Sequence, residues 1–345
     1  MAMPVRLAEV ARHAGVSAAT ASRVLSGRGY VSAVSRDRVR AAALALEYVP
    51  HPAARALSRA RTATVALLVH HAQYPAGSEG TFPSRVVHGV TRGLRAEGHD
   101  LLYVVVDDEA VERLDRLAAT RRGRSDGVLV LGPAFPPDSI RILVGSGRPV
   151  VLIDNRLDEP ALSAVMADNE PAVEALTAHL LDDHGYRRVA CIAGPPHWPS
   201  TAERVAGYSA AIARFGLERR VIHAPSTTAR DGERAAARLL AEPGDPPEAI
   251  VAVNDALAIG ALHRLRTPAG RPAIVGFDDI AWARVTDPPL TTVAVDGELM
   301  GMRAAHLILE RIGAPDQAPP AVVRVAAEPR IRASCGCSQV MEEFL

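Results

Sequence analysis

The chain has 345 residues, 48% of them hydrophobic, so it is long and apolar enough for more than one buried core. It shows no apolar run of about 20 residues that could cross a bilayer and no N-terminal run of the signal-peptide type, so we expect a soluble, cytoplasmic protein. The net charge of zero is unevenly distributed. Residues 1–61 hold ten arginines against three acidic residues, whereas the remainder carries a net charge of −7. A cationic segment of this kind is typical of proteins that contact nucleic-acid phosphates.

Residues 6–25 have the pattern of two short helices joined by a tight turn. One helical face carries apolar side chains at Leu7, Val10, Ala11 and Ala14. Gly15 permits the turn, and Ser17 is a suitable N-cap for the second helix, with Val16 packing on Ala21. This leaves a small polar outer face made of Ala18, Ala19, Thr20, Ser22 and Arg23.

A third helix follows, and we expect Ser35 to cap it and Val34 to pack on Val39. Two amphipathic surface helices of another fold would show the same local pattern. The third helix and the basic charge favour a helix-turn-helix, whose second helix fits a DNA major groove. Residues 47–61 then have the composition of a linker. Pro52 suits a first helical position, but about six residues of helix are unstable alone. The linker is therefore either frayed or a helix that orders on binding.

From Thr64 onward, short apolar runs alternate with amphipathic stretches. The predicted strands are 65–69, 101–106, 128–131, 150–153, 189–193, 250–253 and 274–277. The predicted helices lie near 84–97, 109–120, 137–146, 170–184, 200–215, 229–241 and 255–265. Continuous apolar strands between helices predict an α/β fold with parallel sheets covered on both faces.

Ligands in open α/β sheets bind beyond the carboxyl ends of the strands. The polar and aromatic residues that follow the predicted strands are His70, His71, Tyr74, Phe82, Asp154, Asn155, Arg156, His197, Trp198, Thr201, Arg204, Asn254, Asp255, Asp278 and Asp279. Carboxylates and arginine suit hydroxyl-rich ligands, and an aromatic face can stack on a sugar. Some of these residues have plainer alternatives: Asp255 could cap its helix, Asp279 could be a surface turn residue, and His70 and His71 could be loop surface.

The three cysteines do not form a disulfide framework. Cys191 lies in an apolar run and is expected to be buried. Cys335 and Cys337 have no two further ligands close in sequence, so we expect no metal site and no cofactor.

Enzymatic signals are missing from the sequence, and we expect no catalytic residue. Residues 207–211 lack the second glycine of a nucleophile elbow, and no phosphate-binding glycine motif is present. Two alternatives to a DNA-binding regulator are a sugar-binding protein without a DNA role and an α/β enzyme. The basic head and the missing signal-peptide-type run argue against the first, and the missing motifs argue against the second.

The sequence resembles the LacI/GalR (lactose-repressor) family of bacterial transcription regulators over nearly its whole length. The matching motifs lie at 7–11, 14–17, 20–25, 31–32, 48–50, 54–57, 153–155, 204–208, 254–255, 275–279 and 288–293. Arg6 stands where the family usually has a threonine cap, and His51 replaces a common asparagine. Ala18 and Ala19 stand where relatives often carry larger side chains, so base readout is expected to use thymine methyl groups and Arg23.

The resemblance implies a domain plan. It consists of a helix-turn-helix headpiece at 1–49, a hinge at 50–61, and an effector-binding and dimerisation domain at 62–345 that is similar to periplasmic binding proteins. The N-lobe comprises about 62–164 plus 294–322, and the C-lobe about 165–293 plus 323–333. Three chain crossings are expected between the lobes, and a helix at 296–313 and a strand near 322–326 are expected to return to them before the tail.

The resemblance also implies a homodimeric repressor of a palindromic double-stranded DNA operator, controlled by a small polar effector, a sugar or sugar derivative. The implied DNA contacts are Ser17, Ala18, Ala19, Thr20, Ser22, Arg23, Ala54 and Leu57, with Leu57 entering a minor-groove base step. Arg204, Asn254 and Asp278 stand where the family hydrogen-bonds its effector. Phe82, Asp154, Asn155, Trp198 and Thr201 stand where it lines the pocket.

Overall fold

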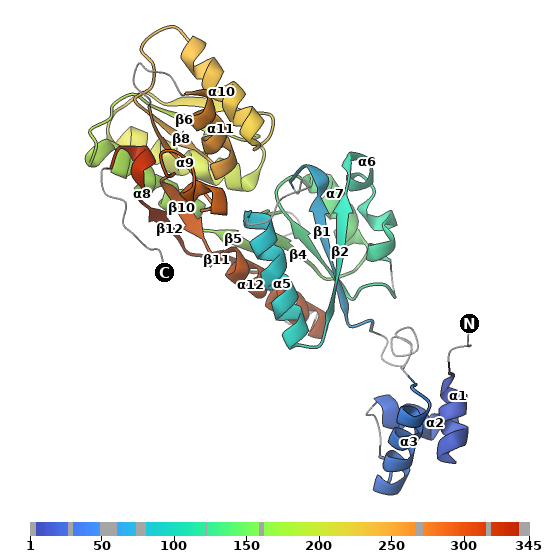
Figure 1. Cartoon of the computed structure of the whole chain (residues 1–345). Helices are drawn as coiled ribbons and strands as arrows, with labels where there is room; N and C mark the ends of the chain where they lie inside the picture. The colour runs from blue at the N-terminus through green and yellow to red at the C-terminus, as the bar shows by residue number, and fades with distance from the viewer. Residues whose placement is uncertain are drawn as a thin grey trace. The chain divides into compact units, whose positions relative to one another are not determined.

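The computed structural model describes residues 5–26, 30–48, 61–73, 81–121, 123–158, 162–265, 272–314 and 319–337 (Figure 1). They form two compact units: residues up to Thr64 together with 121–126, and residues 65–120 together with 127 onward. Ala54, Leu57 and the rest of the expected hinge helix lie outside the described residues, as does Tyr74. No described helix is both long and apolar enough to cross a bilayer.

The headpiece of the first unit contains three helices: α1 (Leu7–Ala14), α2 (Ala18–Ser26) and α3 (Ala33–Ala45). Its small core consists of Val10, Ala11, Ala14, Ala21, Val39 and Ala42. The expected turn is confirmed, because Gly15 has φ 63° between α1 and α2. The expected cap of α2 is also confirmed, since Ser17 Oγ accepts the Thr20 N–H at 3.1 Å.

Two details of the headpiece ends differ from expectation. The cap of α3 is Ser32, whose Oγ accepts the Ser35 N–H at 3.3 Å, so the predicted cap at Ser35 is wrong. Val34 is 69% exposed and does not form the predicted apolar contact. At the start of α1, the Arg6 N–H donates to the Glu9 carboxylate at 2.9 Å. Glu9 thus satisfies the backbone N–H of the N-cap residue, although Arg6 stands where the family usually has a threonine.

The first sheet of the second unit has the strand order β11-β5-β4-β3-β1-β2, and the pairs β1–β3, β3–β4, β4–β5 and β5–β11 are parallel. The strands are β1 (Thr64–His70), β2 (Asp100–Val106), β3 (Gly127–Leu131), β4 (Val150–Ile153), β5 (Ser163–Ala167) and β11 (Val322–Val325). Alternate residues of β1 face different cores. Leu67 packs with helices α5 (Phe82–Ala96) and α12 (Gly297–Gly313), whereas Leu68 packs with α7 (Pro137–Gly145). Both faces of this sheet are therefore covered.

The second sheet has the order β7-β6-β8-β9, with all neighbours parallel. Its strands are β6 (Val189–Ala193), β7 (Arg220–His223), β8 (Ala249–Ala252) and β9 (Ala273–Val275), and its helices are α8 (Asn169–Asp182), α9 (Pro199–Arg214), α10 (Ala229–Ala241) and α11 (Asp255–Arg264). Across the sheet, the connection from β6 to β7 runs in one direction, and the connections from β7 to β8 and from β8 to β9 run in the other. Right-handed crossovers therefore place α9 on one face and α10 and α11 on the other. The expected α/β class with parallel sheets is confirmed.

Three segments of chain pass between the two sheets. β5 of the first sheet leads into α8, and β10 (Thr292–Val295) leads from the second sheet towards α12. β11 of the first sheet leads into β12 (Ala327–Arg330), which pairs antiparallel with β10. The short helix η5 (Ala333–Cys335) follows β12 and contacts β9, because the Ser334 hydroxyl donates to the Ile274 carbonyl at 2.5 Å. The sheets thus form two lobes joined by three crossings.

The single helix predicted at 109–120 is wrong. The structure has instead α6 (Asp108–Val111), η2 (Leu114–Arg116) and η3 (Ala118–Thr120). The Thr120 hydroxyl donates to the carbonyls of Leu114 at 2.7 Å and Leu117 at 2.9 Å, and so takes the place of backbone donors that a continuous helix would supply. Strands β5, β7, β10 and β12 were not predicted. They are only four or five residues long, and β12 contains Pro329, which is tolerated at an edge.

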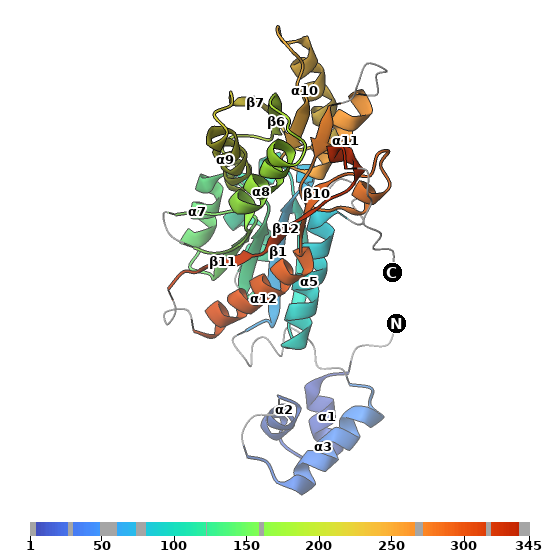
Figure 2. The same ribbon diagram turned by 90° about the vertical axis from the view of Figure 1, so that its left-hand side faces the viewer.

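Glycines bring three pairs of helices into close contact. A Cβ on Gly301 of α12 would overlap the Val86 carbonyl of α5, and these two helices lie side by side in both views (Figures 1 and 2). A Cβ on Gly207 of α9 would overlap the Glu170 carbonyl of α8. One on Gly260 of α11 would overlap the Ala229 carbonyl of α10. Each contact leaves no room for even a methyl group.

We expect Gly260→Ala to destabilise the protein by about 2 kcal/mol, because the added methyl group must push α11 away from α10. Gly145→Ala is the matched control. Its Cβ would meet no atom within 4 Å, so the usual helical preference for alanine should leave stability unchanged or raise it by about 0.5–1 kcal/mol. Urea unfolding of both variants measures the difference, and equal stabilities would contradict the packing argument.

Candidate functional sites

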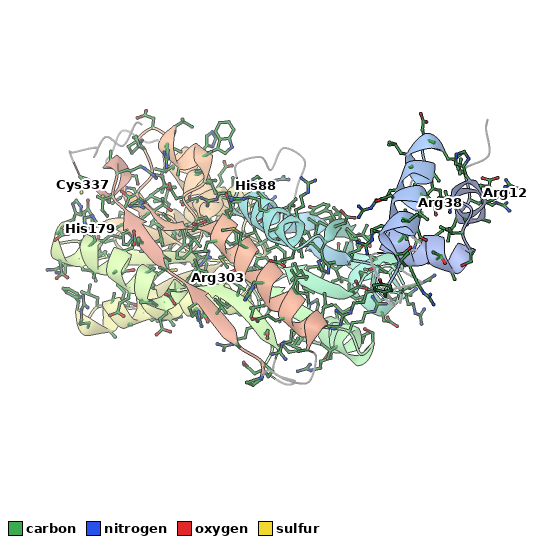
Figure 3. All side chains as sticks on the ribbon, turned by 90° about the horizontal axis from the view of Figure 1, so that it is seen from below. Arg12, Arg38, His88, His179, Arg303 and Cys337 are labelled. Carbon is green, nitrogen blue, oxygen red and sulfur yellow. The ribbon has the colours of Figure 1, made fainter. Side chains whose placement is uncertain are left out.

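The outer face of α2 carries the residues predicted to contact DNA. Ser17, Ala18, Ala19 and Arg23 are exposed, Thr20 and Ser22 are partly exposed, and Ala21 between them is buried in the headpiece core. Further exposed arginines lie on α1 and α3, including Arg12 and Arg38 (Figure 3). A small, smooth helix face with arginines beside it can enter a major groove and contact the flanking phosphates.

A pocket of about 310 Å³ lies in the second unit, where strands of both sheets end. Seven of the eight predicted effector-binding residues line it: Phe82, Asp154, Trp198, Thr201, Arg204, Asn254 and Asp278. They come from both lobes, because Asp154 follows β4 of the first sheet and Asp278 lies just beyond β9 of the second. A molecule bound here would therefore contact both lobes at once.

Arg204 is held firmly at the wall of this pocket by several contacts. Its Nε donates to the Asn169 side chain at 2.8 Å, and its Nη1 donates to the Val253 carbonyl at 2.7 Å. Its guanidinium lies 3.7 Å from the centre of the Phe277 ring and 3.6 Å from an oxygen of Asp278. An arginine fixed in this way presents its remaining donors to a ligand without further loss of side-chain entropy.

Asp278 and Asp154 are the two buried carboxyl groups of the pocket. Their φ angles are 115° and 53°, so both hold backbone conformations that few side chains adopt. Burial raises the pKa of Asp278 to about 6, although Arg204 and Arg85 lower it. Burial raises the pKa of Asp154 to about 7, although Arg204 lowers it, and the neighbouring Asp278 and Glu203 add to the rise. A ligand that donates hydrogen bonds would relieve this desolvation.

Asp154 offers an acceptor that no described residue uses. Ser200 donates to its Oδ2 at 3.4 Å, whereas the buried Oδ1 has no hydrogen-bond partner among the described residues. An unsatisfied buried oxygen is costly, and one that lines a cavity points to a donor on the molecule that fills it.

Asn155 is the one predicted effector residue that does not line the pocket. Its amide donates to the carbonyls of Gly132 at 3.1 Å and Phe135 at 3.5 Å, and so it positions the loop after β3. Asn254 does line the pocket, but its side chain also caps α11 by accepting the Leu257 N–H at 2.9 Å.

The neighbouring acidic residues have structural partners. Asp255 does not cap α11; it is buried and accepts from Ile280 N–H at 2.9 Å and the Thr292 hydroxyl at 2.5 Å. Asp279 is not a surface turn residue, since it pairs with Arg332 at 2.6 Å. His70 is buried against Asp108 at 3.1 Å, whereas His71 is exposed.

Four further polar residues line the pocket without having been predicted: Thr81, Ser200, Thr227 and Thr228. Thr228 caps α10 by accepting from the Asp231 N–H, and the run Ser226-Thr227-Thr228 before a predicted helix was a usable signal. The sequence does not predict the preceding strand β7, so it gives no reason to place this loop at a strand end.

Residues 64–332 match the family model described as periplasmic binding proteins and sugar binding domain of LacI family. Residues 6–51 match the model described as bacterial regulatory proteins, lacI family. The chain belongs to the LacI family. Among curated proteins, this LacI-family chain is 30% identical to the HTH-type transcriptional regulator AscG of Escherichia coli over 90% of its own length and 93% of the relative's. It is 33% identical to the HTH-type transcriptional regulator CelR of Thermobifida fusca, over 88% and 90% of the two chains.

Solved structures agree with this membership. The CelR–cellobiose complex is 31% identical and superposes with a TM-score of 0.71, over 96% of this chain and 99% of that one. The lac repressor dimer bound to operator and the anti-inducer ONPF has a TM-score of 0.82 at 24% identity, with the same coverage, and supports the fold. As a LacI-family member, the protein is a DNA-binding transcriptional regulator.

Proposed function

We propose that this regulator is a cytoplasmic homodimer that represses transcription from a palindromic operator, and that a neutral sugar bound in the pocket controls its affinity for that operator. The observation that carries the proposal is the pocket itself. It combines two buried carboxyl groups, a fixed arginine and the aromatic side chains of Phe82 and Trp198. Carboxylates accept hydrogen bonds from hydroxyl groups, arginine donates to ring and hydroxyl oxygens, and aromatic rings stack on sugar faces.

The charge of the pocket favours a neutral ligand. Arg204 is the arginine of the lining and faces two carboxyl groups with raised pKa values, whereas Arg85 approaches Asp278 from outside the lining. An anionic ligand would add repulsion with these carboxyl groups, whereas hydroxyl donors would satisfy the Asp154 oxygen that has no partner among the described residues. The CelR structure contains cellobiose, so short glucose-containing sugars are the first class to test. We expect binding without chemical change of the sugar.

The test is a thermal-shift screen of monosaccharides and disaccharides, followed by calorimetry and gel-shift assays on operator DNA. A sugar that binds only the folded protein raises its melting temperature by mass action. Operator affinity should change when that sugar is added. Strong binding of a phosphorylated metabolite or a nucleobase, with no response to any neutral sugar, would contradict the proposed effector class.

We expect Arg23→Ala to weaken binding to the selected operator by about 1–3 kcal/mol, or roughly five- to 150-fold, and to relax base preference at one position per half-site. Arg303→Ala, an exposed site on α12 of the other unit, removes the same charge and should leave operator binding unchanged. Gel-shift titrations on operator and random DNA measure both. Equal losses on the two DNAs would show that Arg23 contacts phosphate alone.

A further inference from the structure

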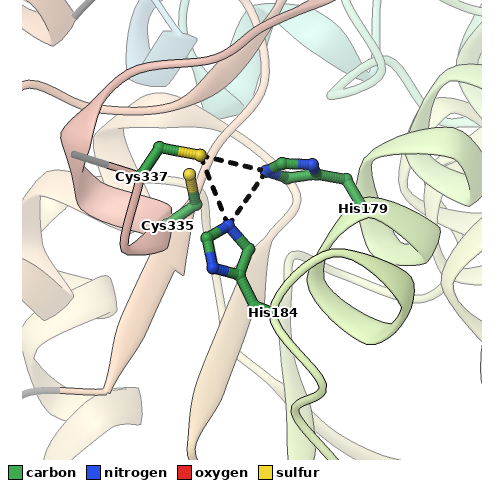
Figure 4. A group of neighbouring side chains, drawn as sticks. All are labelled: His179, His184, Cys335 and Cys337. Atoms are coloured by element: carbon green, nitrogen blue, oxygen red, sulfur yellow. Dashed lines mark hydrogen bonds between the residues drawn. The ribbon is translucent and has the colours of Figure 1, made fainter. Parts of the chain in front are cut away.

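Four potential metal ligands converge at the end of α8, although the two histidines lie far from the two cysteines in sequence. His179 is on the last turn of α8, His184 follows that helix, and Cys335 and Cys337 lie in and just after η5 (Figure 4). Their ligand atoms all lie within 4.8 Å of one another. Figure 3 places His179 and Cys337 at the same end of the second unit. The cluster lies apart from the effector pocket, since none of the four residues lines it.

Three of the four ligand atoms have the spacing expected around a tetrahedral ion. The two Nε2 atoms of His179 and His184 are 3.3 Å apart. Cys337 Sγ lies 3.4 Å from His184 Nε2 and 3.8 Å from His179 Nε2. With Zn–N bonds of about 2.05 Å and Zn–S bonds of about 2.3 Å, a regular tetrahedron has N–N edges of about 3.3 Å and N–S edges of about 3.6 Å. A single ion would therefore fit among these three atoms without large movement of their side chains. Cys335 Sγ lies within 4.8 Å of each of them and would complete the set in place of its present contact with the Arg332 carbonyl at 3.2 Å.

The surroundings orient the ligands towards that centre. His179 Nδ1 lies 2.6 Å from the Asp183 carboxylate, an arrangement that fixes the tautomer and leaves Nε2 for a metal. Tyr186 stacks on the His184 ring at 5.5 Å and donates from its hydroxyl to the Cys335 carbonyl at 3.2 Å. Gly336 has φ 103°, and a Cβ there would lie 2.8 Å from the Tyr186 hydroxyl. Glycine thus lets the chain turn so that both flanking cysteines face the histidines.

We propose that His179, His184, Cys335 and Cys337 bind one Zn²⁺ ion. Two thiolates and two imidazoles in a tetrahedral arrangement form a donor set that selects zinc over hard cations such as Mg²⁺ and Ca²⁺. Four protein ligands leave no open position, so the ion is structural. It fastens the segment that follows β12 to the end of α8, and so anchors one of the three crossings on the second lobe.

Elemental analysis of the full-length protein, purified without a histidine tag under reducing conditions and reconstituted with Zn²⁺, tests the proposal directly. We expect about one zinc per chain, and loss of at least about four-fifths of it in Cys337→Ser and in His184→Gln. The matched controls are Cys191→Ala, a buried thiol of β6, and His306→Gln, an exposed imidazole of α12. Both should keep the zinc. A chelator should lower the melting temperature of the wild type by about 5 °C or more and leave that of Cys337→Ser unchanged.

Cobalt substitution keeps the test decisive if a variant does not fold. Wild-type protein loaded with Co²⁺ should show the intense visible bands of a tetrahedral site together with a thiolate-to-cobalt charge-transfer band. Weak octahedral bands without thiolate character would overturn the proposal. So would retention of zinc in Cys337→Ser with its loss in His71→Gln, which would place the ion at the other histidine cluster, His70, His71 and Asp108. Failure of the reduced wild type to bind zinc would also overturn it.

Discussion

Asp278→Asn should lower affinity for the effector sugar by about two to three orders of magnitude, while operator binding without sugar stays unchanged. The substitution removes the negative charge that faces Arg204 at 3.6 Å and halves the acceptors offered to sugar hydroxyls. Truncating a buried, charge-assisted contact of this kind costs about 2–5 kcal/mol in binding. Asparagine tolerates positive φ better than other replacements do, so the backbone at φ 115° should persist.

Calorimetry with the sugar identified by screening measures the affinity, and gel-shift titration measures operator binding. Asp138→Asn is the matched control, because this exposed carboxylate of α7 loses the same charge and does not line the pocket. Unchanged sugar affinity in Asp278→Asn would show that the pocket assignment is wrong. Loss of both sugar and operator binding would point instead to misfolding.

Asp154→Asn should stabilise the sugar-free protein at pH 8 by up to about 4 kcal/mol and have little effect at pH 4. The folded-state pKa of Asp154 is raised from 3.8 to about 7, so between these pH values the folded protein binds a proton that the unfolded chain has released. Wild-type stability therefore falls as pH rises through that window. Each pKa unit corresponds to about 1.4 kcal/mol, and asparagine has no charge to desolvate.

Urea unfolding at several pH values between 4 and 8 measures this difference. The slope should not vanish in Asp154→Asn, because the raised pKa of Asp278, about 6, makes its own contribution between about pH 4 and 6. Asp138→Asn again serves as control and should follow the wild-type curve. A wild type that gains stability from pH 4 to pH 7 relative to Asp154→Asn would contradict the raised pKa.

The sequence predicted those features that arise from local patterns. The headpiece turn at Gly15 and the cap at Ser17 depend on neighbouring residues alone, and both were confirmed. Seven pocket residues could be predicted because strand ends and family motifs both pointed to them. Asn155 resembled a ligand residue but serves the loop after β3, since its partners at Gly132 and Phe135 are distant in sequence.

The histidine–cysteine cluster was missed for the same reason. Cys335 and Cys337 have no metal-ligating neighbours close in sequence, because their partners lie at the end of α8. The pairing of β12 with β10 and the contact of Ser334 with Ile274 bring η5 to that helix. Both contacts join residues far apart in sequence, so local sequence patterns do not predict them. The short helices at 108–120 were also unpredictable, because amphipathic periodicity does not reveal that the Thr120 hydroxyl will replace backbone donors.

The glycine contacts between helices bear on how a signal can leave the pocket. With backbones touching at Gly301, Gly207 and Gly260, the paired helices have almost no freedom to slide or tilt against each other. We therefore expect strain created by a bound molecule to be absorbed only weakly as repacking inside either lobe. We expect it to appear instead as rotation of one lobe on the other at the three crossings, where a small angular change at the pocket becomes a larger displacement at the far end of each lobe.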